Sequence, residues 1–235
     1  MAVFCTAIDG RHARSADVPP YFKRLIEAGN VEIEFYDPVK DPHTHLGHTE
    51  FKLHVSHRSS FQFGWTLGRD VRELTIRATI RGVSPRLTHT ITVPDWLDSD
   101  RRWDDRLMKH EFDHVAISCD PRVTMLVEHL YDGVDTIEQT VKPDTRIDNR
   151  FVEKLMNERL NSRLKAVVEA VMANQHLLDD VTRHGLRKIA DRKNFFDSLY
   201  TEPNLKMNGF PYLGEVRDLL KSKTYREAKL PYQVD

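Results

Sequence analysis

The stretch RRWDDRLMKHEFDHVAI, residues 101–117, decides how the rest of this chain is interpreted. Five of its residues recur at alternating steps of four and three, which places them on one face of an α-helix. They are Trp103, Leu107, His110, His114 and Ile117. The preceding residues Asp98, Ser99 and Asp100 are candidates for the N-cap. The sequence therefore predicts a helix over 101–117 that carries two imidazoles on its inner face.

His110 and His114 are one turn apart on that helix, so both imidazoles can bind the same metal ion. Glu111 follows the first histidine and can reach a water on that metal. Two neutral imidazoles, a Zn²⁺ that lowers the pKa of its water to about 7, and a carboxylate base are the components of metal-assisted hydrolysis. The alternative is a helix that buries these side chains without a metal, and their desolvation would then be uncompensated. We therefore expect one Zn²⁺ here, with Glu111 as the general base.

A third protein ligand must come from another segment, because a catalytic zinc has three of them and an open position. The longest predicted helix starts at Asp148 and ends at Gly185. Histidines and acids crowd its last turns, and His176, Asp180 and His184 fall four apart on one face. This cluster can supply a metal ligand, or it can be a polar helix end in which the helix dipole favours His184.

The first half of the chain alternates apolar and polar residues, a pattern typical of half-buried strands. The alternation runs through residues 31–36, 51–56, 74–80 and 87–93. We therefore expect an antiparallel sheet of four or five strands over 31–94, polar on one face. Apolar spacing over residues 123–141 favours a helix, although its first residues, VTMLV, can also be interpreted as a buried strand.

The predicted fold class is α+β, with the antiparallel sheet packed against the motif helix and the long helix returning to complete the metal site. Three parts follow from this pattern. Residues 1–97 form a β-rich subdomain, residues 98–185 a helical zinc-binding subdomain of the same catalytic domain, and residues 186–235 a helical or loop C-terminal extension. Short helices are expected near 21–28 and 215–222.

The composition is that of an ordinary soluble protein, with 40% apolar residues, 30% charged residues and a formal net charge of −1. This balance argues against a nucleic-acid binder, which usually has a basic excess. No apolar run reaches the ~18 residues of a membrane span. The N-terminus lacks the basic start and apolar centre of a signal peptide. We therefore expect a cytoplasmic protein, or an exported one whose signal peptide is absent from this chain.

Two further sets of side chains are weaker candidates for metal ligands. His43, His45 and His48 have a metal-like spacing, but nearby Pro and Gly residues indicate an exposed turn, so we expect no physiological metal there. Cys5 and Cys119 are the only thiols. We expect them to be small, partly buried side chains, and a disulfide cannot be inferred from so few cysteines.

Several motifs occur in a fixed order along the chain: the β-rich half, Pro94 to Trp96, Trp103, the core His110-Glu111-x-x-His114, and Asp179-x-x-Thr182-x-His184-Gly185. In this combination, over roughly residues 31–185, the chain resembles predicted bacterial zinc-dependent proteases of the zincin type, a family described as a domain of unknown function. The chain departs from that pattern at Asp113 and Leu178, where the family often has a small residue and a tyrosine.

The resemblance implies a zinc-dependent metallopeptidase, a hydrolase that acts on a peptide or protein substrate. It also favours His184 as the third zinc ligand, since His184 belongs to the later motif and directly precedes the helix-ending glycine. Asp180 is an alternative ligand one turn earlier. We expect Asp179 to orient an imidazole, although it too can ligate, and Glu128 is a weaker candidate.

In the expected mechanism Zn²⁺ polarises the scissile carbonyl and its own water, and Glu111 passes the proton of that water to the leaving amine. The candidates for an oxyanion donor are Tyr131, His129, Arg183, Tyr200 and Tyr212. Two alternatives are a zinc hydrolase that acts on a non-peptide substrate and a non-catalytic module in which zinc joins helices. A structural zinc of that kind would have four protein ligands.

Overall fold

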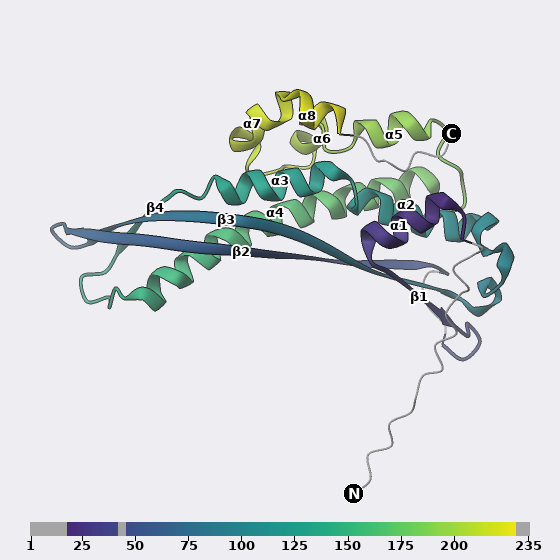
Figure 1. The fold of residues 1–235 in the computed structure, drawn as a ribbon, viewed down its shortest axis with the longest axis horizontal. Coiled ribbons are helices and arrows are strands. Elements are labelled where there is room, and N and C mark those ends of the chain that lie inside the picture. Colours follow the sequence, from purple (N-terminus) through teal and green to yellow (C-terminus); the bar gives the residue numbers. More distant parts are fainter. Residues whose placement is uncertain (1–17, 42–45, 229–235) are drawn as a thin grey trace, which may run out of the picture.

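The computed structural model describes residues 18–41 and 46–228, which form an α+β fold as predicted. Figure 1 shows a long, twisted sheet whose strands β2 and β3 extend as an arm beyond most of the helices. In chain order the elements are α1 (Pro20–Gly29), β1 (Val31–Tyr36), β2 (His48–Leu67), β3 (Arg72–Pro94), the 3-10 helices η1 (Asp95–Leu97) and η2 (Asp100–Asp104), α2 (Arg106–Ser118), α3 (Pro121–Asp132), β4 (Thr136–Val141), α4 (Asn149–Thr182), α5 (Arg192–Ser198), α6 (Glu202–Met207), α7 (Leu213–Lys221) and α8 (Lys223–Glu227).

Strand β3 is the centre of the sheet. β2 pairs antiparallel along one edge of β3, while the other edge pairs with β4 near its start and with β1 near its end. The pairing of β1 is parallel, from Val31 opposite His89 to Tyr36 opposite Pro94. The expectation of a purely antiparallel sheet is therefore wrong. The period of two in the sequence defines which side chains share a face, but it carries no information on strand direction.

The strands expected at 74–80 and 87–93 are one continuous strand, β3. The pairing of β2 with β3 shifts register between Ser56 and Arg58 of β2, opposite a stretch of β3 that contains Gly82. Gly82 has a φ of 62°, in the left-handed region that favours glycine. A β-bulge of this kind absorbs an extra residue and increases the local twist, so the strand continues instead of turning back.

The inner face of the sheet is apolar and packs against helices, while its outer face is polar, as expected. Leu74, Ile76, Ala78 and Ile80 alternate with exposed neighbours and are buried in the same core as the apolar residues of α3. Burial of this kind contributes roughly 25 cal/mol per Å² of apolar surface. It fixes the register, because a slip by one residue would turn these side chains into water.

The helix expected over 123–141 is correct only in its first half, because residues 136–141 form β4. Asp120 caps α3 by accepting a hydrogen bond from the backbone N–H of Arg122. The chain then leaves the helix at Gly133, and the N–H of Ala78 bonds to the carbonyl of Asp135 at 2.7 Å. The apolar spacing of residues 136–141 is compatible with a helix or a strand, and pairing with the free edge of β3 makes this segment a strand.

The long helix is confirmed as α4, capped by the Asp148 side chain, which accepts from the N–H of Phe151. Figure 1 shows α6, α7 and α8 stacked over α3 and α4, away from the sheet. Tyr200 in this C-terminal region is fully buried and donates a hydrogen bond to the carbonyl of Ile117, the penultimate residue of α2. The C-terminal segment therefore completes the core behind the motif helix. Within residues 18–41 and 46–228, no helix has the length and apolar character needed to cross a membrane.

Candidate metal centre

Helix α2 holds the His-Glu-x-x-His motif and contributes several residues to the hydrophobic core. It begins later than expected, because residues 100–104 form the separate 3-10 helix η2. The N-cap is Asp105, whose side chain accepts from the N–H of Leu107 at 2.7 Å, so the cap lies five or more residues after the positions expected at Asp98, Ser99 and Asp100. Nearly every residue of α2 from Met108 onward is buried, so the orientation of the motif side chains is fixed by packing on all sides.

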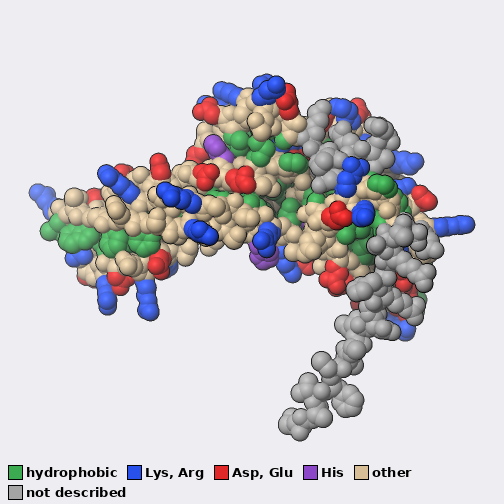
Figure 2. Space-filling view, viewed as in Figure 1, with side chains coloured by type: hydrophobic (Ala, Val, Ile, Leu, Met, Phe, Trp, Pro, Cys, Tyr) green, Lys and Arg blue, Asp and Glu red, His purple; other side chains and the backbone are tan. Residues whose placement is uncertain are grey.

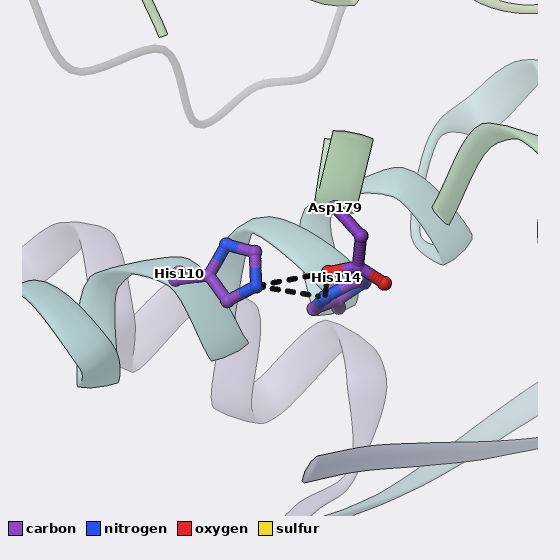
Figure 3. A group of neighbouring side chains, drawn as sticks. All are labelled: His110, His114 and Asp179. Carbon is purple, nitrogen blue, oxygen red and sulfur yellow. Dashed lines mark hydrogen bonds and ion pairs between the residues drawn. The ribbon is translucent and has the colours of Figure 1, made fainter. Parts of the chain in front are cut away.

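Three side chains from two helices converge on one point. The Nε2 atoms of His110 and His114 lie 3.2 Å apart, and they lie 3.1 Å and 3.2 Å respectively from Oδ1 of Asp179. Figure 3 shows the histidines on one helix and Asp179 approaching from another, with the three polar groups facing one another. Within the described residues, these three side chains are the potential metal ligands that lie this close together. We call His110, His114 and Asp179 the metal group.

The spacing of these three atoms fits a tetrahedral zinc site. Ligand atoms placed 2.0–2.1 Å from a tetrahedral Zn²⁺ are separated from one another by about 3.3–3.4 Å, close to the separations found here. Two ring nitrogens that face each other at 3.2 Å need a proton or a cation between them. A divalent ion accepts all three lone pairs at once, so the residues present are suited to bind one.

The electrostatic environment also favours a cation. Burial by itself would raise the pKa of Asp179, but hydrogen bonds from His110 and His114 outweigh it and hold the pKa of this carboxyl well below its usual range. Burial lowers the pKa of His114, yet the hydrogen bond to Asp179 and the charge of Glu111 raise it above its ordinary value. The surrounding carboxylates thus stabilise positive charge at the point where the three side chains meet.

The later sequence motif surrounds the imidazole of His110. The hydroxyl of Thr182 donates to the carbonyl of Leu178 at 2.7 Å and lies 3.4 Å from Nδ1 of His110, so it can accept the Nδ1–H of that ring. This leaves the lone pair of Nε2 directed at the metal position. A Cβ atom on Gly185 would lie 3.0–3.1 Å from the His110 ring, so a side chain there would press on the imidazole, and the φ of 76° also favours glycine.

His184, the expected third ligand, lies beside the group of three. Its side chain is 60% exposed, and its Nδ1 is 3.6 Å from Oδ1 of Asp179. Helix α4 ends at Thr182, and both Arg183 and His184 adopt a φ of 52° in the left-handed region. This break ends the helical spacing on which the face of His176, Asp180 and His184 depended. The geometry favours Asp179 over His184, while the identity of the third ligand stays a prediction.

The other candidate ligands lie outside the group. Asp180 is exposed on α4, next to the inward-facing Asp179. Glu128 lies on α3, where partial burial and Asp132 raise its pKa, and it does not line the cavity at the metal group. His43, His45 and Cys5 lie outside the described residues. Cys119 is partly buried, as expected, and this burial raises the pKa of its thiol to about 12.

The carboxylate of Glu111 is held by strand β2. The hydroxyl of Thr49 donates to Oε2 of Glu111 at 2.7 Å, and the same hydroxyl lies 3.2 Å from the Glu111 backbone carbonyl. Gly47 lies so close that a Cβ on it would overlap Oε1 of Glu111. No sequence motif marks Gly47 or Thr49, because their role depends on how the start of β2 and the residue before it pack against α2.

A cavity of about 870 Å³ opens onto the metal group. One wall is formed by residues 46–51, which are Leu46, Gly47 and the start of β2, and the opposite wall belongs to α4, including Met172 and His176. His48 and His184 also line it. The edge of β2 that faces away from β3 pairs with no other strand of the described residues.

Of the five candidates for an oxyanion donor, Arg183 lines this cavity and the other four do not. The hydroxyl of Tyr200 bonds to Ile117, that of Tyr212 to Ser162, His129 bonds to the carbonyl of Glu215, and Tyr131 is buried against His57. These four side chains are structural in the described fold.

Comparison with protein-family models, with curated proteins and with solved structures found no match to this chain. The fold and the site geometry are therefore the basis for any assignment of function.

Proposed function

We propose that this chain is a zinc-dependent metallopeptidase of the zincin type, with Zn²⁺ bound by His110, His114 and Asp179 and with Glu111 as the general base. The observation that carries the proposal is the meeting of three ligand atoms, a neighbouring carboxylate and a strand edge around one cavity. A group of three protein ligands beside an open cavity is typical of catalytic zinc, whereas structural zinc has four.

The chemistry divides between the ion and the protein. When bound, Zn²⁺ lowers the pKa of a water to about 7 and polarises a carbonyl. Glu111 accepts the proton from the attacking water and delivers it to the leaving amine. Thr49 holds the Glu111 carboxylate in one orientation through the hydrogen bond at 2.7 Å. Arg183, which lines the cavity, is the cationic donor for the developing oxyanion.

The edge of β2 supports a peptide as the substrate class. An extended peptide can add to a free strand edge through backbone hydrogen bonds, with alternate side chains directed into pockets. The start of β2, from His48 to Phe51, lines the same cavity as Glu111 and the metal group, and Thr49 bonds directly to Glu111. A peptide bound there would have its backbone within reach of the catalytic groups.

The first experiment separates metal binding from chemistry. Zinc content and peptide hydrolysis would be measured for wild type, Glu111→Gln, Asp179→Ala and His184→Ala. We expect Glu111→Gln to retain zinc and to lose about 10²–10⁴-fold in rate, as is typical for a general base. Asp179→Ala should lose zinc affinity, and the matched variant of its exposed neighbour, Asp180→Ala, should keep it. Undiminished hydrolysis in Glu111→Gln would refute the mechanism.

The same set of variants decides the third ligand. If His184→Ala loses zinc while Asp179→Ala retains it, the ligand is His184 as first expected from the sequence. The substrate class is tested with a cleaved peptide and with versions carrying single backbone N-methyl groups. N-methylation removes a hydrogen-bond donor, so it should abolish cleavage at the positions that pair with β2. Hydrolysis of small esters or amides with no cleavage of any peptide would favour a non-peptide hydrolase.

A further inference from the structure

The outer face of the β2–β3 ribbon carries a concentration of positive charge. Residues 52–62 of β2 and 77–88 of β3 contain five Lys and Arg residues and no Asp or Glu. All five side chains are exposed: Lys52, Arg58, Arg77, Arg81 and Arg86. We call this set the basic band. The net charge of the chain is −1, so the basic band reflects a local arrangement and not a general excess of cations.

Repulsion between the charges of the basic band lowers the stability of the sheet. Arg58 lies directly opposite Arg81 in the strand register. Like charges on directly opposed residues of neighbouring strands destabilise a sheet. Among the described residues, the four arginines make no ion pair, and Lys52 has a partner in Glu50 at 3.5 Å. An anion placed over the ribbon would relieve this repulsion.

The remaining outward residues of the same stretch are small and polar. They are His54, Ser56, Ser60, Gln62, Thr79, Ser84 and Thr88. Hydroxyl and amide groups such as these donate hydrogen bonds to phosphate oxygens. No outward position in the stretch is Phe, Tyr, Trp or an aliphatic residue. The basic band therefore offers no surface on which single-stranded bases could stack and no apolar group to insert into a bilayer.

The length of the basic band matches a turn of duplex nucleic acid. From Lys52 to Gln62 the strand advances by roughly 33 Å at about 3.3 Å per residue, and one turn of B-form DNA is about 34–36 Å long. The side chains of this face are exposed, so no described helix covers it. Figure 2 shows Lys and Arg side chains, with some Asp and Glu side chains among them, on the part of the molecule that contains the arm.

From these observations we propose that the basic band binds the phosphate backbone of double-stranded nucleic acid, without sequence preference. The binding is electrostatic, with the arginines on the phosphates and the Ser, Thr and Gln side chains as secondary donors. It is independent of the metal group, so it goes beyond the proposed peptidase activity. It also runs against the expectation from overall composition, because the net charge averages the basic band with acids elsewhere in the chain.

The test is the binding of the full chain to a labelled 25-base-pair DNA duplex of mixed sequence, followed by fluorescence anisotropy between 50 and 200 mM salt. We expect binding that weakens steeply with salt. The variant Arg58→Gln with Arg81→Gln should bind at least about 10-fold more weakly at 50 mM, and its slope of log K against log salt should be shallower by about 2. Arg77→Gln with Arg86→Gln is a second variant with the same expectation.

The matched control removes two exposed lysines far from the ribbon, Lys206→Gln with Lys221→Gln, which changes the net charge by the same amount. This control should bind DNA as wild type does, and no variant should have a thermal midpoint below that of wild type, since removing opposed arginines relieves repulsion in the sheet. Absence of duplex binding by wild type at 50 mM salt overturns the proposal. So does an equal loss in the control, or band-dependent binding to phosphatidylserine vesicles in place of DNA.

Discussion

At the scale of single residues, Gly185 is the last residue of the motif that begins at Asp179, and it packs directly against His110 of the metal group. Gly185 has a φ of 76°, and a Cβ there would meet the ring of His110. Two constraints act at this position: the positive φ of the backbone and the contact with the His110 ring. Only the contact with His110 should change the affinity for the metal directly.

We therefore predict that Gly185→Ala lowers zinc affinity by about 10–100-fold, the range typical when the groups that orient a ligand are altered. The matched control is Gly209→Ala, where φ is 67° and a Cβ would meet nothing within 4 Å. Both variants carry similar backbone strain, so titration with a zinc chelator isolates the contact with His110. Equal zinc affinities in the two variants would show that the contact does not position the ligand.

The sequence was informative about the metal group wherever the information was local. His110, Glu111 and His114 were predicted together because they share one helix, and the structure brings the two histidines to one point. The choice between Asp179 and His184 depended on where α4 ends. Two non-glycine residues in the left-handed conformation end the helix at Thr182, and no sequence pattern announces that conformation for Arg183 and His184.

At the scale of elements, the buried side chain of His89 joins β3 to α1 and α2. Its Nδ1 donates to the carbonyl of Gly29 at 2.7 Å, and its Nε2 accepts from the hydroxyl of Ser118 at 2.6 Å. Burial lowers the pKa of His89 below its ordinary value of 6.5, so the folded protein keeps this ring neutral. The unfolded chain takes up a proton as the pH falls below about 6.5.

Because the unfolded state binds more protons, the contribution of His89 to stability is complete above pH 6.5 and declines at lower pH. We predict that the difference in free energy of unfolding between wild type and His89→Gln shrinks from pH 7 to pH 5, by up to about 1.4 kcal/mol per pH unit. Urea unfolding of the metal-free proteins measures it. Other titrating groups are common to both proteins and cancel, so a constant difference would contradict the prediction.

A second link between elements joins α5 to the motif helix. The guanidinium of Arg192 pairs with Asp113 on α2 at 2.5 Å and donates to the hydroxyl of Tyr21 on α1. Burial raises the pKa of Asp113, and the charge of Arg192 counteracts this effect. Removing the arginine would leave a buried carboxylate without its partner.

We predict that Arg192→Met destabilises the fold by about 3 kcal/mol, the lower end of the range for buried pairs, since the Arg192 side chain keeps 31% exposure. The double variant Asp113→Asn with Arg192→Met should recover part of that loss, because no charge is then buried. Chemical unfolding of the two proteins is the measurement. A double variant less stable than Arg192→Met would show that the ion pair is not the cause.

The two strands that were predicted wrongly, β1 and β4, have one physical cause in common. Residues 136–141 were predicted as helix but form β4, and β1 was predicted to be antiparallel but is parallel. Both segments pair with the same edge of β3, and this pairing cannot be seen in their local sequence. Local periodicity predicted α2, the start of α3, α4 and the alternation of the sheet correctly. Partners that are distant in sequence decide the rest.

At the scale of the whole molecule, a bound metal would connect α2 with the end of α4, segments that belong to one core but are far apart in sequence. A ligand that binds only the folded state stabilises it by about 4 kcal/mol when its free concentration is 1,000 times Kd. We predict that EDTA lowers the thermal midpoint of wild type, whereas His110→Ala, which lacks a ligand, unfolds at the same temperature with and without EDTA. Identical midpoints for wild type in both conditions would contradict a zinc site at this position.

The parallel pairing of β1 with the end of β3 also determines the order in which a nascent chain can fold. As the ribosome delivers the chain from its N-terminus, β1 finds its partner only when His89 to Pro94 have emerged. The hairpin of β2 and β3 can close earlier, since its strands are neighbours in sequence. The two motif histidines emerge next, but Asp179 follows only after nearly all of α4 has been made. The three potential metal ligands can therefore come together only after most of the chain has been made, so a chain that ends before Asp179 lacks the complete group.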